Sequence, residues 1–191
     1  MSDAQPTPGP TTTPAPAQAA LAGAVQEIER HVSTGGWDGP VRVFALVRTA
    51  QALASEPGLA TQLPPAVVAA AQQDPLHLTS VEQEELPPAR DLEELLAVIS
   101  WPETVDGAAL VVERVVLPPA AEDGMPQDAD EAMTYLMNHP DRQDVRLAVG
   151  VLRSGEAWCA VRTRAADDDA AVAGGPDVVP GLVEAVRATL L

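Results

Sequence analysis

Apolar residues recur at helical spacing near the beginning of the chain and again at its end. Near the beginning, Leu21, Val25, Ile28 and Val32 follow one another at intervals of three and four residues, and the glycine pair at 35–36 ends the run. Such spacing is typical of an amphipathic helix. The same spacing predicts a C-terminal helix, whose apolar positions are Val179, Leu182, Val183, Val186 and Leu190.

Three stretches between these helices have the composition of β-strands. Two of them, "PVRVFALVRT" (40–49) and "GAALVVERVVLPP" (strand expected at 108–117), carry apolar residues at both odd and even positions, which predicts burial on both faces. The third, "DVRLAVGVLRSGEAWCAVRTRA", predicts a β-hairpin that turns at Ser154 and Gly155. A two-residue turn there would pair Val151 with Trp158 and Gly150 with Cys159.

Shorter helices are expected between the strands. Thr49 is a candidate N-cap for a helix that ends near Ser55, and Pro64 and Pro65 open another. Asp91 is expected to cap a third helix, and acidic residues open a fourth, which ends at Pro140. The stretch "LHLTSVEQEELPPAR" (76–90) is largely polar and is expected to be irregular.

The order of these elements predicts a single α+β domain over residues 17–191. Its sheet is expected to have four strands, mostly antiparallel, with the helices packed on it. Residues 1–16, "MSDAQPTPGPTTTPAP", are rich in Pro and Thr and carry almost no large apolar side chain. Because they bury too little surface to offset the entropy cost of ordering, we expect a disordered tail.

Composition and charge exclude several classes of partner. The net charge is −17, because the chain has 28 acidic and 11 basic residues. All eleven basic residues are arginine. Nucleic acids and anionic membranes are therefore disfavoured. The chain has no long apolar run, no signal-peptide pattern and a single cysteine, so the sequence predicts a cytoplasmic protein. The absence of lysine, together with abundant Ala, Val and Pro, indicates high-GC coding.

The sequence offers no strong catalytic or metal-binding motif. The predicted pairing places Cys159 in a small apolar neighbourhood, which indicates a core residue rather than a nucleophile; the expected neighbours are Ala148, Leu152, Ala157 and Val161. The adjacent carboxylates of Asp167, Asp168 and Asp169 do not fit a calcium loop. They indicate either a solvated acidic loop or a contact for a basic partner. We expect no cofactor and no bound metal, since phosphate-loop and zinc patterns are missing.

Two tryptophans and three arginines remain as candidate binding residues. Trp37 and Trp101 lie in predicted loops of a chain with only 3% aromatic residues, so they are either interface anchors or side chains that fold back over the edge of the core. We favour the second interpretation. Arg114, Arg146 and Arg162 lie in predicted strands and could hold an anionic ligand. The competing explanation is that they pair with nearby carboxylates.

Several ordered blocks of the sequence resemble a known family. The blocks are "GGWDGPVRVFALVRTA", "LTSVEQEELP", "LEELLAVISWPETVDGAALVVERVVLPP", "HPDRQDVRLAVGVLRSGEAWCAVR" and "DVVPGLVEAVRATL". Together they resemble an uncharacterised actinobacterial family of small acidic cytoplasmic proteins, over residues 17–191. That family has no established activity, so the resemblance implies a bacterial cytoplasmic protein and supplies no catalytic residue.

These observations favour a non-enzymatic protein-interaction module, such as an adaptor, a chaperone-like protein or a regulator. The alternative is a small-molecule-binding or enzymatic domain that holds an anionic ligand through the strand arginines. The predicted helices can cover one face of the sheet fully but the other only in part. We therefore also expect a monomer–dimer equilibrium, with a homodimer formed through the sheet or through the loops of Trp37 and Trp101.

Overall fold

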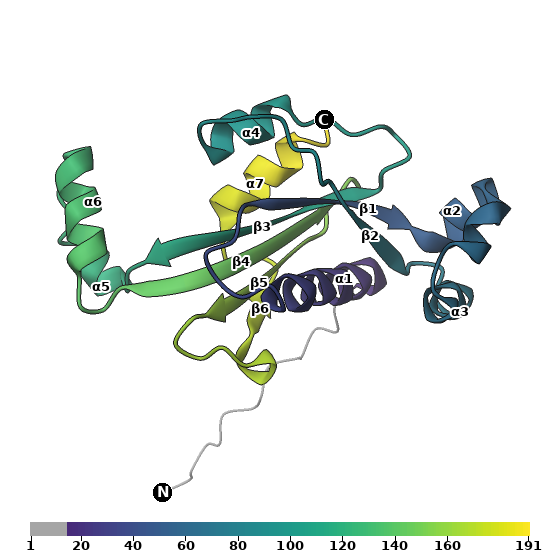
Figure 1. Ribbon diagram of the computed structural model, residues 1–191, viewed down its shortest axis with the longest axis horizontal. Helices are drawn as coiled ribbons and strands as arrows, with labels where there is room; N and C mark the ends of the chain where they lie inside the picture. Colours follow the sequence, from purple (N-terminus) through teal and green to yellow (C-terminus); the bar gives the residue numbers. More distant parts are fainter. Residues whose placement is uncertain (1–14) are drawn as a thin grey trace, which may run out of the picture.

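The protein folds around one antiparallel sheet of six strands. The computed structural model describes residues 15–191, so nearly all of the predicted tail lies outside the described residues. The strand order is β2-β1-β3-β4-β5-β6 (Figure 1). The strands are β1 (Arg42–Arg48), β2 (Leu78–Glu82), β3 (Gly107–Val116), β4 (Gln143–Leu152), β5 (Ala157–Thr163) and β6 (Ala173–Gly175).

Within residues 15–191, seven α-helices accompany the sheet. They are α1 (Pro16–Ser33), α2 (Thr49–Ser55), α3 (Pro65–Gln73), α4 (Leu92–Val98), α5 (Pro119–Glu122), α6 (Ala129–Asn138) and α7 (Pro180–Ala188). Two short 3-10 helices follow the same chain order, η1 (Pro57–Thr61) and η2 (Asp169–Ala171). Asp91 caps α4 by accepting a hydrogen bond of 2.8 Å from the Glu94 N–H, as the sequence predicts. Thr49, however, does not cap α2: Arg48 holds the N-cap position, and the Thr49 hydroxyl bonds His77 and Thr79 instead.

The α+β class and the antiparallel pairing were predicted correctly, but the number of strands was wrong. The two strands that the sequence did not predict form the edges of the sheet. β2 is polar and buries only Leu78, because it has a neighbour on one side only. β6 has three residues, Ala-Gly-Gly, so it carries no apolar pattern that would predict a strand. Edge strands of this kind are short and weakly hydrophobic, which leaves little signal in the sequence.

The predicted pairing of the β4–β5 hairpin was wrong by one residue. The Leu152 N–H donates to the Glu156 carbonyl at 2.9 Å, and Gly155 has a φ of +110°, so the loop has three residues rather than two. Three-residue loops with a residue of positive φ are a common hairpin type. Cys159 therefore pairs with Val149 instead of Gly150.

This shift changes which residues of β4 lie beside Cys159. A slip of one residue turns each side chain toward the other face of the sheet. Cys159 packs with Val149, Val151 and Ala157, whereas Ala148 and Leu152, which we expected beside it, belong to the core on the opposite face. The expectation that Cys159 is a core residue is confirmed, because its side chain is 0% exposed.

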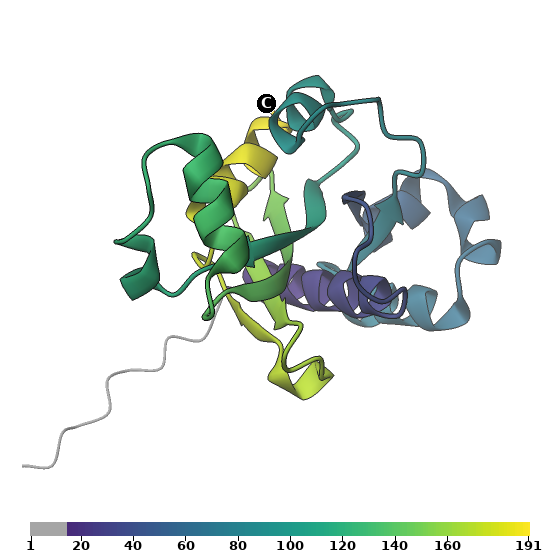
Figure 2. The same cartoon turned by 60° about the vertical axis from the view of Figure 1, so that its left-hand side comes forward.

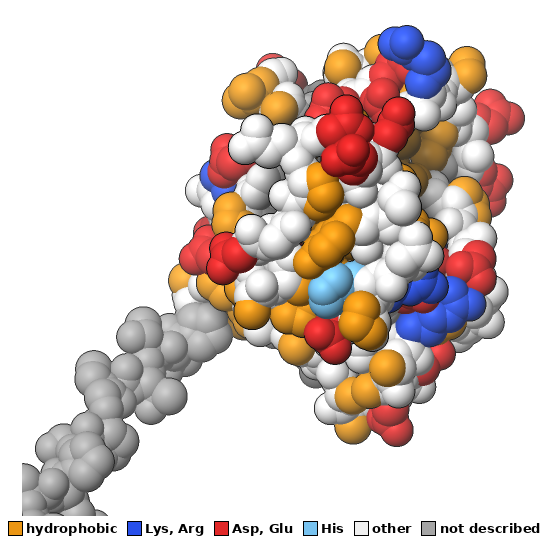
Figure 3. All heavy atoms as spheres, turned by 90° about the vertical axis from the view of Figure 1, so that its left-hand side faces the viewer, with side chains coloured by type: hydrophobic (Ala, Val, Ile, Leu, Met, Phe, Trp, Pro, Cys, Tyr) orange, Lys and Arg blue, Asp and Glu red, His pale blue; other side chains and the backbone are white. Residues whose placement is uncertain are grey.

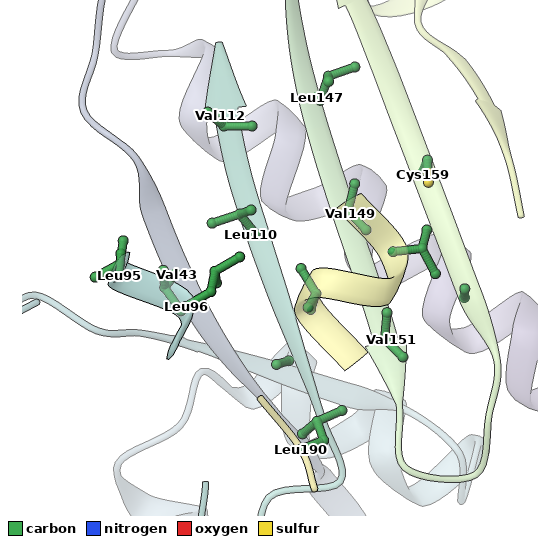
Figure 4. Close-up of a cluster of buried hydrophobic side chains, with 14 of the residues drawn as sticks. Val43, Leu95, Leu96, Leu110, Val112, Leu147, Val149, Val151, Cys159 and Leu190 are labelled. Atoms are coloured by element: carbon green, nitrogen blue, oxygen red, sulfur yellow. The ribbon is translucent and has the colours of Figure 1, made fainter. Parts of the chain in front are cut away.

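Two hydrophobic cores lie on the two faces of the sheet. On one face, α1 lies against β3, β4 and β5, and its buried stripe packs on Phe44, Ala109 and Ala148. On the other face, α7 packs against β3 and β4, and α4 packs against α7 (Figure 1). Figure 4 shows this second core, in which Val149, Val151 and Cys159 of the sheet lie close to α7.

The helix α6 stands apart from both cores. It follows β3 and α5 and lies at the far end of β3 and β4, where it projects beside the sheet (Figure 2). None of its ten residues is buried, and its contacts with the rest of the fold are mainly with the end of β3. The face that carries α4 and α7 is therefore covered by separated, short helices, while α1 alone spans the opposite face.

Substitution of two glycines tests how tightly α1 packs on the sheet. A Cβ at Gly150 would lie 2.5 Å from Val25 Cγ2 and 3.0 Å from Leu21 Cδ1, so Gly150→Ala should lower the free energy of unfolding by about 1–3 kcal/mol. A Cβ at Gly23, within α1, meets nothing within 4 Å, so Gly23→Ala should raise it by about 0.5–1 kcal/mol. Urea unfolding of both variants measures this. Equal effects of the two changes would contradict the packing of α1 on β4.

The burial of Cys159 predicts slow thiol chemistry. Burial raises the pKa of this thiol, so little thiolate is present at neutral pH. In the native protein a thiol reagent should label Cys159 only through unfolding, whereas the urea-unfolded chain should be labelled at once. Mass spectrometry against time follows the reaction. Rapid stoichiometric labelling of the native protein would show that Cys159 on β5 is accessible to solvent.

Candidate functional site

A cluster of buried charges joins α1 to the sheet. The Glu29 carboxylate, on α1, is 1% exposed and accepts hydrogen bonds from Arg162 Nε at 2.7 Å and Nη2 at 2.8 Å. Arg146 lies directly opposite Arg162 on the neighbouring strand, and its Nη1 is 3.7 Å from Glu29 Oε1. One carboxylate thus holds two guanidinium groups between a helix and a sheet. The hydrogen bond to Glu29 raises the pKa of Arg162, so this group remains charged.

Arg146 of β4 extends the cluster to Glu113 on the neighbouring strand β3. Its Nη2 donates to Glu113 Oε1 at 2.9 Å and to the Gly36 carbonyl. Its Nε and Nη1 are buried and have no hydrogen-bond partner among residues 15–191. The guanidinium lies 4.4 Å from the centre of the Trp37 ring, a cation–π contact that partly offsets the loss of water.

The loop that carries Trp37 covers the outer side of the cluster. Gly36 and Asp38 have φ angles of +81° and +65°, which turn the chain back over Arg146. Trp37 Nε1 donates to Asp167 Oδ2 at 2.9 Å, and Asp38 accepts two hydrogen bonds from Arg164 at 2.9 and 2.8 Å. The hydrogen bonds from Trp37 and Arg164 lower the pKa of Asp167 and Asp38, respectively.

The structure brings together some of the residues that we singled out as interaction candidates. Trp37 and Asp167 are bonded to each other, and Asp169 accepts from Arg162 Nη2 at 2.5 Å. Asp168 accepts from the Ala170 N–H and caps η2. Trp101 lies elsewhere, where its Nε1 donates to Thr189 Oγ1 at 3.0 Å and its ring packs against the core around α7. Both loop tryptophans therefore make internal contacts.

The three candidate arginines do not line a common cavity. Arg162 borders a hollow of 140 Å³ beside α1, and Arg146 borders one of 320 Å³ beneath the Trp37 loop. Arg114 lies on the opposite face of the sheet from these two and lines two other cavities, of 770 and 310 Å³. Arg146 and Arg162 are held by carboxylates, and Arg114 has none within 4.0 Å among the described residues.

An apolar groove lies between α4 and α7. Its volume is 770 Å³, and its walls are formed by Leu92, Leu96 and Ile99 on one side and by Leu182 and Ala185 on the other. Asp91, Glu93 and Arg114 also line it. Each wall is part of the apolar stripe by which its helix packs on the core. Leu96 of α4 and Val183 of α7 continue these stripes into the core.

Exposed apolar side chains also occur on α4, beside this groove, and on α6, which lies apart from it. Met133 and Met137 are one turn apart on α6 and are 58% and 46% exposed, and Val98 of α4 is 58% exposed. Figure 3 shows the end of the molecule that carries α6, where hydrophobic side chains form a band between acidic side chains at the top and a histidine below. Apolar side chains gathered on one exposed surface can mark an interaction site.

The described residues do not form a recognisable catalytic centre. Within residues 15–191, no group of three or more His, Cys, Asp or Glu side chains is placed to hold a metal ion. In the same part of the chain, Cys159 is buried and bonded to no histidine, and each histidine interacts locally: His31 with Arg42, His77 with Thr49, and His139 with Tyr135.

Glu29 and the groove are the two features that the sequence reasoning missed. Glu29 lies three and four residues from Val32 and Val25, and therefore within the apolar stripe of α1. A carboxylate at a core position requires a buried partner, and the two strand arginines were the available cations. That signal could have been found. The groove depends on the distance between two helices, which the sequence does not carry.

Comparisons with known proteins place the chain in a family. A family model described as PPA1309-like protein matches residues 21–191, so the chain belongs to the PPA1309-like family. No curated protein and no solved structure matches the chain significantly. Among the described residues, no helix has both the length and the apolar character needed to cross a membrane.

Removing the Glu29 carboxylate should strongly destabilise the fold. Glu29→Gln would leave two buried arginines without their shared anion, which should cost about 3–5 kcal/mol of the free energy of unfolding. The matched control is Glu27→Gln, since Glu27 is an exposed residue of α1 and should change stability by less than about 0.5 kcal/mol. Chemical denaturation provides both values. Similar small effects of the two substitutions would contradict the role of the cluster.

Proposed function

We propose that this member of the PPA1309-like family is a non-enzymatic protein-interaction module that binds a basic amphipathic helix of another protein in the groove between α4 and α7. The observation that carries the proposal is the open apolar groove on a sheet face that the chain's own helices cover only in part. The side chain of Val98, 58% exposed on α4, supports it by adding apolar surface to the same helix.

The dimensions of the groove suit a helix. The walls are α4, with seven residues, and α7, with nine, so each wall is about 10–14 Å long at a rise of 1.5 Å per residue. Two to three turns of a partner helix match that length. Such a helix would place apolar side chains at positions i, i+3, i+4 and i+7 against Leu92, Leu96 and Leu182.

The charge of the chain selects a basic partner. The net charge is −17, and Asp91 and Glu93 line the groove. Further carboxylates stand at the first turn of α6, where Asp128, Asp130 and Glu131 are exposed. Lysine or arginine on the outer face of a partner helix would meet these groups, which speeds association and excludes acidic competitors.

A second copy of the chain is the competing occupant. Each copy would bring the same net charge of −17, so self-association is opposed at low ionic strength. The two tryptophans that we considered as dimer anchors bond Asp167 and Thr189 of their own chain. A homodimer would therefore depend on other exposed apolar side chains, such as Val81 of β2, Val98 of α4 and Met133 of α6.

The origin and compartment that we propose rest on the sequence. The basic residues are all arginine and the chain is rich in Ala, Val and Pro, which supports an actinobacterial, high-GC source. A single, buried cysteine suits a reducing compartment, and we propose a cytoplasmic location.

A designed peptide pair tests the groove. One peptide is a helix with leucine on one face and lysine on the other, and the second has glutamate in place of lysine. Fluorescence anisotropy with the full chain should show saturable binding of the basic peptide, on the order of 1–100 μM, and a weakening with salt. The acidic peptide should not bind.

Substitutions in the chain locate the peptide. Ala185→Glu places a charge on the groove wall and should weaken binding by about tenfold or more, since it buries an unpaired carboxylate against apolar side chains. Ala54→Glu, at an exposed position of α2, makes the same change of charge away from the groove and serves as the control. Equal binding to both variants, or none to the native protein, would reject the groove as the docking site.

A further inference from the structure

A second cavity lies at the other end of the sheet, between the Trp37 loop and the end of α6. Its volume is 310 Å³, and it is lined by Trp37, Val115 and Met137 together with arginines and carboxylates. The three arginines are Arg114, Arg142 and Arg164, from β3, from the turn before β4 and from the end of β5. Figure 3 shows basic side chains gathered beside the histidine on this side of the molecule.

This cavity is lined by two arginines that lack a carboxylate partner among the described residues. All eleven arginines lie within the described residues, and eight of them have a carboxylate within 4.0 Å. Of the other three, Arg153 donates to backbone carbonyls of Val105, Trp101, Pro102 and Leu190. The remaining two, Arg114 and Arg142, line the same cavity.

The carboxylates of the cavity are already engaged by other groups. Asp38 accepts two hydrogen bonds from Arg164, whose Nη1 also lies 3.8 Å from Asp144. Glu113 accepts from Arg146 at 2.9 Å and from the Asp38 N–H at 2.7 Å. Arg114 and Arg142 have no carboxylate within 4.0 Å among residues 15–191, and the nearest cation to each of the three wall carboxylates Asp38, Glu113 and Asp144 is another arginine.

Backbone contacts hold both free guanidinium groups near the cavity. Arg142 Nη1 donates to the Met137 carbonyl at 2.7 Å, at the last turn of α6, and Arg114 Nη1 donates to the Glu113 carbonyl at 3.3 Å. Each contact uses one donor of a guanidinium that has five N–H bonds. The other donors remain for a ligand.

We propose that this cavity binds a small molecule that carries a phosphate monoester. Two guanidinium groups match the two negative charges of such a group near neutral pH, and their planar forks bond its oxygens in pairs. The apolar remainder of the ligand would lie against Met137, Val115 and the accessible part of Trp37. A ligand with one negative charge would leave one arginine uncompensated and would bind less tightly.

This site is separate from the groove of the proposed function. Arg114 lines both cavities, but Arg142 lines only the smaller one. A variant at Arg142 therefore changes the anion site and leaves the walls of the α4–α7 groove intact. The two proposals can fail independently.

Titration with phenyl phosphate tests the site. Amide chemical shifts of the full chain, recorded at pH 7.5 and physiological ionic strength, should change saturably with a Kd on the order of 1 mM or lower, for residues of β3, β4 and the Trp37 loop. Arg142→Gln should weaken binding by about tenfold, since one charge-assisted contact is lost. Arg90→Gln removes the same charge from an exposed arginine elsewhere and should leave the affinity unchanged.

Two further probes define the ligand class. Benzoate has the same ring with one negative charge and should bind more weakly than phenyl phosphate, whereas inorganic phosphate should compete with phenyl phosphate for the site. The proposal is overturned if phenyl phosphate causes no saturable change up to the order of 10 mM, well above the expected Kd. It is also overturned if Arg142→Gln binds as the native protein does, or if benzoate binds as tightly.

Discussion

The fold depends on one buried carboxylate. Glu29 projects from the apolar stripe of α1 and holds Arg162 and Arg146, which stand side by side on β4 and β5. Removing three charges from water is costly, so these charges must lie against one another in the folded state, even though Arg146 Nε and Nη1 have no hydrogen-bond partner among residues 15–191. This requirement fixes the rotation of α1 on the sheet. It also fixes two loops, because the Trp37 ring lies over Arg146 and the Asp167–Asp169 segment completes the bonding of Arg162.

The two faces of the sheet differ in how completely they are covered. The α1 face is closed by apolar packing and by the charge cluster, and its loops are bonded to each other across large distances in the sequence. The opposite face is covered by α4 and α7, which leave a groove between them, whereas α6 projects beside the sheet and buries none of its residues. The partner that we propose would bind in this groove, and the net charge of −17 would favour a basic one.

The sequence predicted those parts of the fold that depend on local patterning. The apolar periodicity of α1 and α7, the β-rich runs of β1, β3, β4 and β5, and the cap of α4 by Asp91 all follow from neighbouring residues. The edge strands were missed because they bury little. The hairpin pairing was wrong because a three-residue loop with Gly155 at positive φ differs from a two-residue turn by one position. Among the candidate residues, Trp37, Asp167 and Arg162 were named separately, and only their positions in three dimensions show that they form one network.

Hydrogen–deuterium exchange of the full chain, with and without the basic amphipathic peptide, tests the difference between the two faces most directly. In the free protein, amides of α1, β4 and β5 should exchange slowest and those of α6 fastest, because α6 buries nothing. Addition of the peptide should slow exchange in α4 and α7 and leave α1 unchanged. Protection of α6 equal to that of α1 in the free protein, or slowing confined to the α1 face, would contradict the account.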